Sequence, residues 1–133
     1  MQTGRSQSSA AVDSSGNIYA IGGSGSSGAL NTVEKYTSST NTWTTVASMP
    51  GPTSCLGSAT DLNGNIYAIG GAANNVGINT VYKYNPSANT WTTVAPIPTA
   101  GCPGGVAVDS SGNIYAMGGF TVPGAVYESS VEK

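Results

Sequence analysis

The chain has 133 residues and few charged side chains, which excludes several classes of protein. Only 8% of the residues are charged, against about a quarter in an average globular domain, and the net charge is -2. A chain with so few basic residues lacks the positive surface that binds nucleic acid or an anionic membrane. It also contains no histidine, so the commonest general base and metal ligand is missing.

The main feature of the sequence is an internal repeat of 48 residues. The segment at residues 13–23, Asp-Ser-Ser-Gly-Asn-Ile-Tyr-Ala-Ile-Gly-Gly, returns with small changes at 61–71 and 109–119. A second segment, at 31–47, returns at 79–95. Periods of about 20–50 residues are typical of solenoids, propellers and other repeat arrays. The repeat therefore predicts three units, at residues 1–48, 49–96 and 97–133.

Each unit contains short runs of β-forming residues in the same order. For the first unit we predict four strands, at 9–12, 17–21, 32–36 and 42–46. Copies of its first strand are expected at 58–60 and 106–108. The Asp-Ser-Ser-Gly-Asn segment predicts a tight turn between the first two strands, and a longer glycine-rich loop joins the second strand to the third.

The second strand of the first unit is apolar on both faces. Ile18 and Ala20 point to one side of the predicted sheet, and Tyr19 and Ile21 point to the other. Such a strand must be covered on both sides, as it is when a sheet is stacked between two others. The predicted fold class is therefore all-β, with four-stranded antiparallel sheets packed side by side.

The repeated residues resemble the kelch repeat family, whose pattern is an apolar strand ending in Gly-Gly, then a Tyr, then six residues and a Trp. The matching positions are Gly22, Gly23, Tyr36, Trp43, Gly70, Gly71, Tyr84, Trp91, Gly118 and Gly119. The resemblance covers essentially the whole chain and implies kelch-type β-propeller blades, about 2.8 in number. We assign these repeated residues to the structure of the blades and not to ligand binding, since each copy faces the same packing problem.

The chain is expected to form only part of a propeller ring. Residues 131–133 match residues 33–35, so the third unit is expected to lack its outer strand, whereas a propeller has about 4–8 complete blades. Three accounts stay open. The chain is a piece of a longer or engineered propeller, or two copies form a ring of about six blades, or copies add head to tail without closing.

No catalytic residue, cofactor or metal site is predicted. Among kelch relatives, the copper-dependent galactose oxidases use histidine and tyrosine ligands, and no such set can be assembled without histidine. The repeated aspartates Asp13, Asp61 and Asp109 fit caps of their own turns better than a carboxylate ring around a cation. For Cys55 and Cys102, which precede the first strands of adjacent units, a disulfide and two reduced, half-buried thiols both stay open.

The loops that differ between units lie on one face of the predicted propeller. They join the second strand to the third and one unit to the next, and we predict that this face meets a ligand or partner, if any does. The predicted contacts, with Phe120 and Tyr127 placed in a loop, are Arg5, Asn74, Asn75, Phe120 and Tyr127.

The predicted function is a non-enzymatic binding or structural module that self-associates or belongs to a larger propeller. The partners expected are a second copy, the rest of a longer chain, or a protein or glycan ligand, and neither nucleic acid nor a membrane. The alternatives are an extracellular carbohydrate-binding module and a scaffold segment of a larger enzyme. Abundant Ser, Thr and Asn favour an extracellular or cell-surface location, and a cytoplasmic one stays open.

Overall fold

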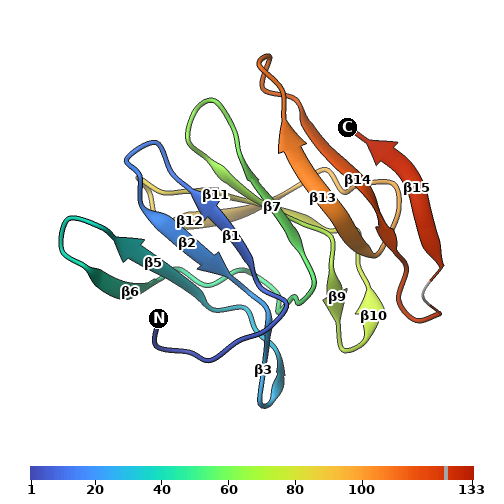
Figure 1. Ribbon diagram of the computed structural model, residues 1–133, viewed down its shortest axis with the longest axis horizontal. Helices are drawn as coiled ribbons and strands as arrows, with labels where there is room; N and C mark the ends of the chain where they lie inside the picture. The colour runs from blue at the N-terminus through green and yellow to red at the C-terminus, as the bar shows by residue number, and fades with distance from the viewer. Residues whose placement is uncertain (125) are drawn as a thin grey trace.

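The computed structural model describes residues 1–124 and 126–133, and these form a fan of antiparallel sheets without any helix (Figure 1). Blade 1 contains β1 (Ser9–Val12), β2 (Ile18–Ile21), β5 (Val33–Thr37) and β6 (Thr42–Val46). Blade 2 contains β7 (Gly57–Thr60), β8 (Ile66–Ile69), β11 (Val81–Asn85) and β12 (Thr90–Val94). Blade 3, in the part of the chain that is described, contains β13 (Cys102–Val108), β14 (Ile114–Phe120) and β15 (Tyr127–Glu132). The predicted all-β fold with four-stranded antiparallel blades is confirmed.

Two short hairpins rise from the loops that the sequence predicted only as glycine-rich. In blade 1 the hairpin is β3 (Ser24–Gly25) with β4 (Gly28–Ala29), and in blade 2 it is β9 (Ala72–Ala73) with β10 (Val76–Gly77). Each hairpin also pairs with the segment that enters a first strand, through bridges between Ser6 and Ser24 and between Ser54 and Ala72. These bridges hold the variable loops against the body of each blade.

The first strand of each blade lies innermost, where β7 contacts both β1 and β13 (Figure 1). Hydroxyl groups join β1 to β7: Ser9 and Ser58 share a hydrogen bond of 2.6 Å between their Oγ atoms, and Thr60 donates to the Val12 carbonyl at 2.8 Å. At the next interface Gly57 replaces a side chain, because a Cβ there would overlap Val106. Neighbouring blades therefore approach closely at their inner strands.

The two interfaces between blades differ in the size of their apolar cores. The core between blades 1 and 2 is formed by nine buried residues: Ala11, Tyr19, Ile21, Val33, Met49, Leu56, Ile66, Ala68 and Tyr84. The buried core between blades 2 and 3 is much smaller, with Ile69, Val81 and Ala116. Since burial of apolar surface is the main favourable term in folding, the first interface is the better stabilised.

The Gly-Gly pairs are required by the segments that pass over the ends of the second strands. Gly22 and Gly23 both have positive φ, 58° and 99°. A Cβ on Gly22 would lie 2.5 Å from the Thr53 carbonyl oxygen, and one on Gly23 would lie 2.6 Å from that of Ser6. Both glycines of the pair therefore need the absence of a side chain.

The three repeated aspartates each organise the turn between the first two strands of a blade. The Asp13 carboxylate accepts hydrogen bonds of 2.9 Å from the backbone N–H groups of Ser15 and Asn17, from the Asn17 amide and from the Tyr19 hydroxyl. Asp61 and Asp109 make the same set of bonds in blades 2 and 3. The turn-cap interpretation is therefore confirmed, and it explains the repetition without a cation.

Acid is expected to weaken the fold through these turns. Burial raises the pKa of Asp13 and of Asp61. Hydrogen bonds to the two carboxylates, chiefly from Asn17 and from Asn65, outweigh the effect of burial, so both pKa values lie below the ordinary 3.8. Hydrogen bonds from Asn113 lower the pKa of Asp109 to about 2. Carboxyls with a lowered pKa stabilise the fold above the unfolded value, and this stability is lost as the pH falls through the folded value.

We therefore expect the free energy of unfolding, measured in urea, to fall between about pH 4 and about pH 2. The variant Asp13→Asn should be less stable than the wild type near neutral pH and should lose less stability in acid. An unfolding free energy that is unchanged over this range would contradict the role given to the turns.

Among the described residues, none lies in a helix that is long and apolar enough to cross a membrane.

Candidate functional site

The variable loops lie on one face of the fan, opposite the aspartate turns (Figure 1). Asn74 and Asn75 occupy the tip of the β9–β10 hairpin, where both are exposed and both have positive φ, 51° and 62°. Two residues with positive φ in succession are typical of the tightest hairpin turns, in which asparagine is favoured. The turn explains this Asn pair, and it also presents two amide side chains to the solvent.

Arg5 is buried within blade 1. Its Nη2 lies 2.7 Å from Glu34 Oε2, with side-chain exposures of 0% and 1%. Its Nη1 donates to the carbonyls of Gly22 and Thr32, at 2.8 and 3.0 Å. The backbone N–H groups of Gln2 and Thr3 also donate to Glu34. The fold therefore uses this guanidinium, and we leave Arg5 out of the binding surface proposed below.

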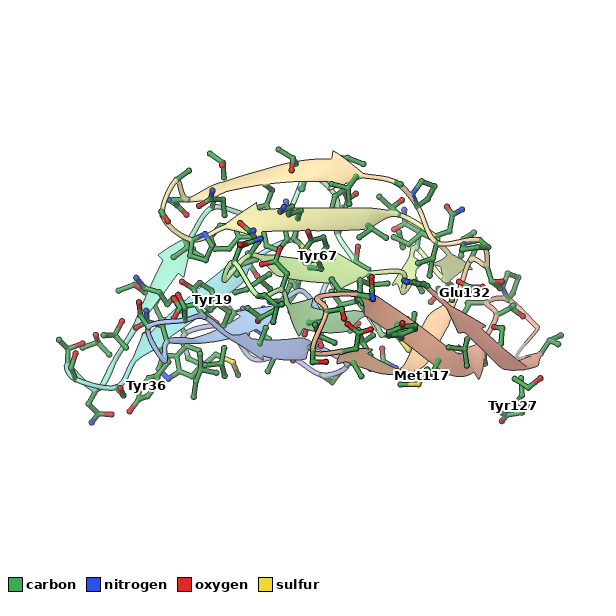
Figure 2. The ribbon with its side chains drawn as sticks, turned by 90° about the horizontal axis from the view of Figure 1, so that it is seen from above. Tyr19, Tyr36, Tyr67, Met117, Tyr127 and Glu132 are labelled. Carbon is green, nitrogen blue, oxygen red and sulfur yellow. The ribbon has the colours of Figure 1, made fainter. Side chains whose placement is uncertain are left out.

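Phe120 and Tyr127 lie in strands and not in a loop, so the predicted position of both was wrong. They face each other as partners of β14 and β15, with ring centroids 6.5 Å apart. The reason is that β14 continues through Gly118 and Gly119, with an irregularity between Met117 and Gly119 that resembles a β-bulge. Tyr127 is 83% exposed and points away from the body of the molecule (Figure 2).

Two of the variable loops are joined on this face. The Gly77 N–H, at the base of the Asn74–Asn75 hairpin, donates to the Val122 carbonyl at 2.8 Å. Val122 follows β14, so the hairpin of blade 2 lies beside the loop of blade 3. The structure thus places the hairpin that carries Asn74 and Asn75 beside the loop between Phe120 and Tyr127, and it places Arg5 elsewhere.

The two cysteines meet between blades 2 and 3, and both are free. Cys102 is buried at the start of β13, and Cys55, just before β7, is half-buried. Burial raises the pKa of the Cys102 thiol, and its hydrogen bond and charge interaction with Cys55 raise it further. The proximity of the thiols is what a disulfide between adjacent blades needs, and that disulfide stays a prediction.

The outer flanks of blades 1 and 3 expose apolar side chains. On blade 1 these are Val12 and Ile18, and on blade 3 they are Met117 and Val131. Figure 2 shows Met117 at the outer side of blade 3. The equivalent positions inside the fan are covered by a neighbouring blade: Ile66, the counterpart of Ile18, has an exposure of 0%, whereas Ile18 has 40%. This contrast in burial makes the outer flanks candidate contact surfaces.

A polar hollow of about 460 Å³ lies on the face of the aspartate turns. It is lined by residues of the turns of blades 1 and 2, including Ser14, Asn17, Lys35, Asn63 and Asn85. Sequence reasoning missed this hollow, because the turns that line it are nearly constant between units and were assigned to the scaffold. If the carbohydrate-binding alternative holds, this hollow is a place where hydroxyl groups would find donors and acceptors.

The described residues contain no group of three or more His, Cys, Asp and Glu side chains placed to hold a metal ion. Each aspartate is engaged within its own turn. The prediction that the chain carries no catalytic residue stays a prediction, since the structure offers no direct test of it.

Antiparallel blades that pack face to face and meet at their inner strands define the chain as part of a β-propeller. A family profile, "Kelch motif", matches residues 5–50 and 55–98. The chain therefore belongs to the kelch-motif family, and the resemblance noted in the sequence is confirmed.

A solved structure described as "Structure of YjhT" is similar to this chain, with a TM-score of 0.77 and 27% sequence identity. The similarity covers 92% of this chain and 36% of the other, so the chain spans about a third of the length of that neighbour. The search of curated proteins found no significant match.

Proposed function

We propose that this chain is a non-enzymatic kelch-repeat module that binds a second copy of itself through its two outer blade flanks. The observation that carries the proposal is a contrast in burial between equivalent positions. At three positions that are exposed at the outer flanks, the counterparts at the interface between blades 1 and 2 are buried: Ile66 for Ile18, Ile21 for Met117 and Val33 for Val131. A second copy offers that missing neighbour without any new type of contact.

The outer flank of blade 3 shows the contrast most clearly. Met117 and Val131 are register partners in blade 3, as Ile21 and Val33 are in blade 1. Ile21 and Val33 have exposures of 0%, because blade 2 covers them, whereas Met117 has 38% and Val131 has 65%. Blade 3 therefore presents the same type of face that blade 1 buries against blade 2.

The outer flank of blade 1 is the complement of that face. Its Ile18 corresponds to Ile66, and its Tyr36 and Trp43 correspond to Tyr84 and Trp91 of blade 2, which pack against blade 1. Blade 1 of one copy can thus pack on blade 3 of another copy in the same way that blade 2 packs on blade 1 within the chain. Two such contacts close a ring of about six blades if the rotation fits, and an open series results if it does not.

The test is the native mass of the chain measured by light scattering over a range of concentrations. We expect association, and we expect Val131→Lys to weaken it at least about tenfold, because an ammonium group would be buried without a partner. Val76→Lys is the matched control: Val76 is also an exposed valine in a strand, but it lies on a loop hairpin away from the flanks.

A wild-type chain that stays monomeric at every concentration would contradict self-association. Association that Val131→Lys leaves unchanged would show that another surface is responsible. A dimer would favour a closed ring, and large species would favour an open-ended assembly.

A further partner of the assembly, a protein or a glycan, would bind at the loop face. The surface proposed consists of Asn74, Asn75, Phe120 and Tyr127, supported by the hydrogen bond that joins the two loops. The extracellular or cell-surface location remains part of this proposal and rests on composition. The enzyme-scaffold alternative would place the chemistry in residues outside this chain.

A further inference from the structure

Blade 3 keeps a glutamate that blade 1 pairs with an arginine, but it lacks the arginine. Glu132 holds the place of Glu34 in the register of the sheets, and Gly101 holds the place of Arg5 in the segment that enters the first strand. Glu132 lies on β15 (Figure 2) and accepts a hydrogen bond from the Thr99 N–H at 3.4 Å. In the described part of the chain, no ion pair includes Glu132. Blade 3 therefore holds a carboxylate without the cation that neutralises its counterpart.

The other acceptors around the Arg5 guanidinium also have counterparts in blade 3. In blade 1 the guanidinium donates to the carbonyls of Gly22 and Thr32 and to the Thr32 hydroxyl, at 2.8, 3.0 and 3.3 Å. The same places in blade 3 are held by Gly118 and Ser130, which supply two carbonyls and a hydroxyl. Gly118 has a φ of 55°, close to the 58° of Gly22, so the backbone turns alike at both positions. The set of acceptors for a guanidinium is thus repeated.

A small pocket lies at the place of the missing guanidinium. It measures about 20 Å³, and its lining includes Thr99, Gly101, Gly118, Ser130 and Glu132. Each of these residues is the counterpart of a member of the ion pair in blade 1, or of a residue bonded to that pair. A space of this size admits about one water-sized group, so it suits the flat end of a planar cation better than a sugar or an aromatic ring.

Position 101 itself cannot supply the missing cation. A Cβ on Gly101 would lie 2.5 Å from the Phe120 carbonyl oxygen, closer than real Cβ atoms come. The obstruction arises because β14 continues to Phe120 in blade 3. A guanidinium that fills the pocket must therefore enter from elsewhere.

The lysines of the chain are placed elsewhere too. Lys83 lies 3.9 Å from Asp61, and the Lys133 ammonium lies over the Tyr115 ring, 6.0 Å from its centroid. Lys35 lines the polar hollow of blades 1 and 2. An ammonium would also match the acceptors less well, because it lacks the planar fork of donors of a guanidinium. The pocket is therefore open to a cation from another molecule.

The site does not depend on a fourth strand in blade 3. None of the bonds that hold Arg5 involves β6, the outer strand of blade 1. The acceptors in blade 3 likewise belong to β14 and β15, and the segment before β13 completes the lining of the pocket. Glu132 is half-buried, whereas the Glu34 side chain is 1% exposed, so a ligand in solution can reach the Glu132 carboxylate.

We infer that blade 3 carries a binding site for a guanidinium group of another molecule. The Glu132 carboxylate pairs with the cation, and the oxygens of Gly118 and Ser130 accept its remaining N–H groups. The site is distinct from the outer flank of blade 3, because adjacent residues of a strand point to opposite sides and Val131 lies on that flank. The inference therefore does not rest on the proposed function.

The experiment titrates the full chain, labelled with ¹⁵N, with N-acetyl-L-arginine amide. We expect the amide signals of Gly118 and Glu132 to shift and that of Gly22 to stay. The expected dissociation constant is about 1–10 mM, since one charged contact and a few hydrogen bonds contribute. The citrulline compound of the same design keeps the shape without the charge and should bind at least about tenfold more weakly. The lysine compound keeps the charge without the planar fork and should also bind more weakly.

Free arginine identifies the source of the guanidinium. An affinity similar to that of the blocked compound would assign the site to an arginine side chain within a polypeptide. Tighter binding of free arginine would assign it to the free amino acid. Both results support a guanidinium site.

Variants of blade 3 test the contact from the protein side. Glu132→Gln should weaken binding at least about tenfold, because the ion pair is lost. Its unfolding free energy should change little, since glutamine still offers an oxygen to the Thr99 N–H. Ser130→Ala should weaken binding a few-fold through the lost hydroxyl. Ser129→Ala is the matched control, since Ser129 is exposed beside it in the same strand, and it should bind like the wild type.

The variant Arg5→Ala is a positive control, because it opens the same set of acceptors in blade 1. In this variant the blocked arginine should shift the Gly22 and Glu34 signals in addition to those of Gly118 and Glu132. Shifts at Gly22 without shifts at Gly118 would overturn the inference, since the compound would then bind such a site in blade 1 and not in blade 3.

Three results with the wild-type chain would also overturn the inference. They are the absence of shifts at Gly118 and Glu132 up to about 50 mM blocked arginine, equal binding of the citrulline or lysine compound, and binding that Glu132→Gln leaves unchanged. Failure of this site is distinguishable from failure of the proposed function. If the chain is monomeric by light scattering and still binds the blocked arginine, self-association alone fails. If the chain associates and the compound does not bind, the guanidinium site alone fails.

Discussion

The variant Arg5→Ala is expected to be less stable than the wild type by about 3–5 kcal/mol. The guanidinium and the Glu34 carboxylate form a 2.7 Å ion pair with almost no exposure to solvent. Removing the cation leaves a buried carboxylate with only the hydrogen bonds from Gln2 and Thr3. It also leaves the carbonyls of Gly22 and Thr32 without their donor. The free energy of unfolding, from denaturant titration, measures the loss.

Blade 2 supplies the control for this prediction. At the equivalent positions it has Thr53 in place of Arg5, Tyr82 in place of Glu34 and Gly51 in place of Thr3. The glycine matters, because a Cβ at position 51 would lie 2.8 Å from the Tyr82 hydroxyl. The triple variant Thr3→Gly, Arg5→Thr, Glu34→Tyr therefore transfers the uncharged arrangement of blade 2 and should recover most of the stability. A loss below about 1 kcal/mol in Arg5→Ala would mean that the pair contributes no more than a surface salt bridge.

The variant Trp91→Ala is expected to lose about 3–5 kcal/mol of unfolding free energy. Its ring packs on the buried Tyr84, and its N–H joins blade 2 to the Ala47 carbonyl of blade 1. Trp91→Phe keeps an aromatic ring and should lose about 1 kcal/mol or somewhat more, because the carbonyl loses its donor. These measurements are made at low protein concentration, where the flanks are not covered by a second copy.

Trp43→Ala is the matched control, since Trp43 holds the same place in blade 1. Trp43 stacks on Tyr36 at 5.3 Å, but its flank is open, and among the described residues it makes no bond to a neighbouring blade. We expect its replacement to lose less than half as much stability as that of Trp91. Equal losses would contradict the view that contacts between blades give the repeated Trp its stabilising effect.

The repeat was a good predictor of the blade structure, because the same short-range constraints recur every 48 residues. The aspartate turn, the Gly-Gly pair and the Tyr and Trp of the outer strands are all defined by neighbours within one blade or in the next. Each copy therefore keeps the same residue types, and a comparison of the copies shows them. The kelch family and the four-stranded blades followed from this pattern alone.

The candidate binding residues were harder to predict, because they differ between copies. Arg5 differs from Thr53 and Gly101, which hold the equivalent positions in the other units, and this difference suggested a ligand contact. The structure shows instead that Arg5 pairs with Glu34, which lies on a strand distant in the sequence. Phe120 was expected in a loop, because the Gly-Gly pair ends the strand in the other blades. In blade 3 the bulge lets β14 continue past the Gly-Gly pair, and no local sequence pattern predicts this bulge.

The sequence by itself determined the type of blade, the number of strands in each complete blade and the role of the repeated residues, since these depend on local hydrogen bonds and on the alternation of apolar side chains. Only the tertiary structure decided which apolar faces are covered and which are open. Ile18 and Ile66 are identical in type and in strand position, yet one has an exposure of 40% and the other of 0%. The physical reason is that burial depends on the next blade in space, which no run of residues within a single repeat encodes.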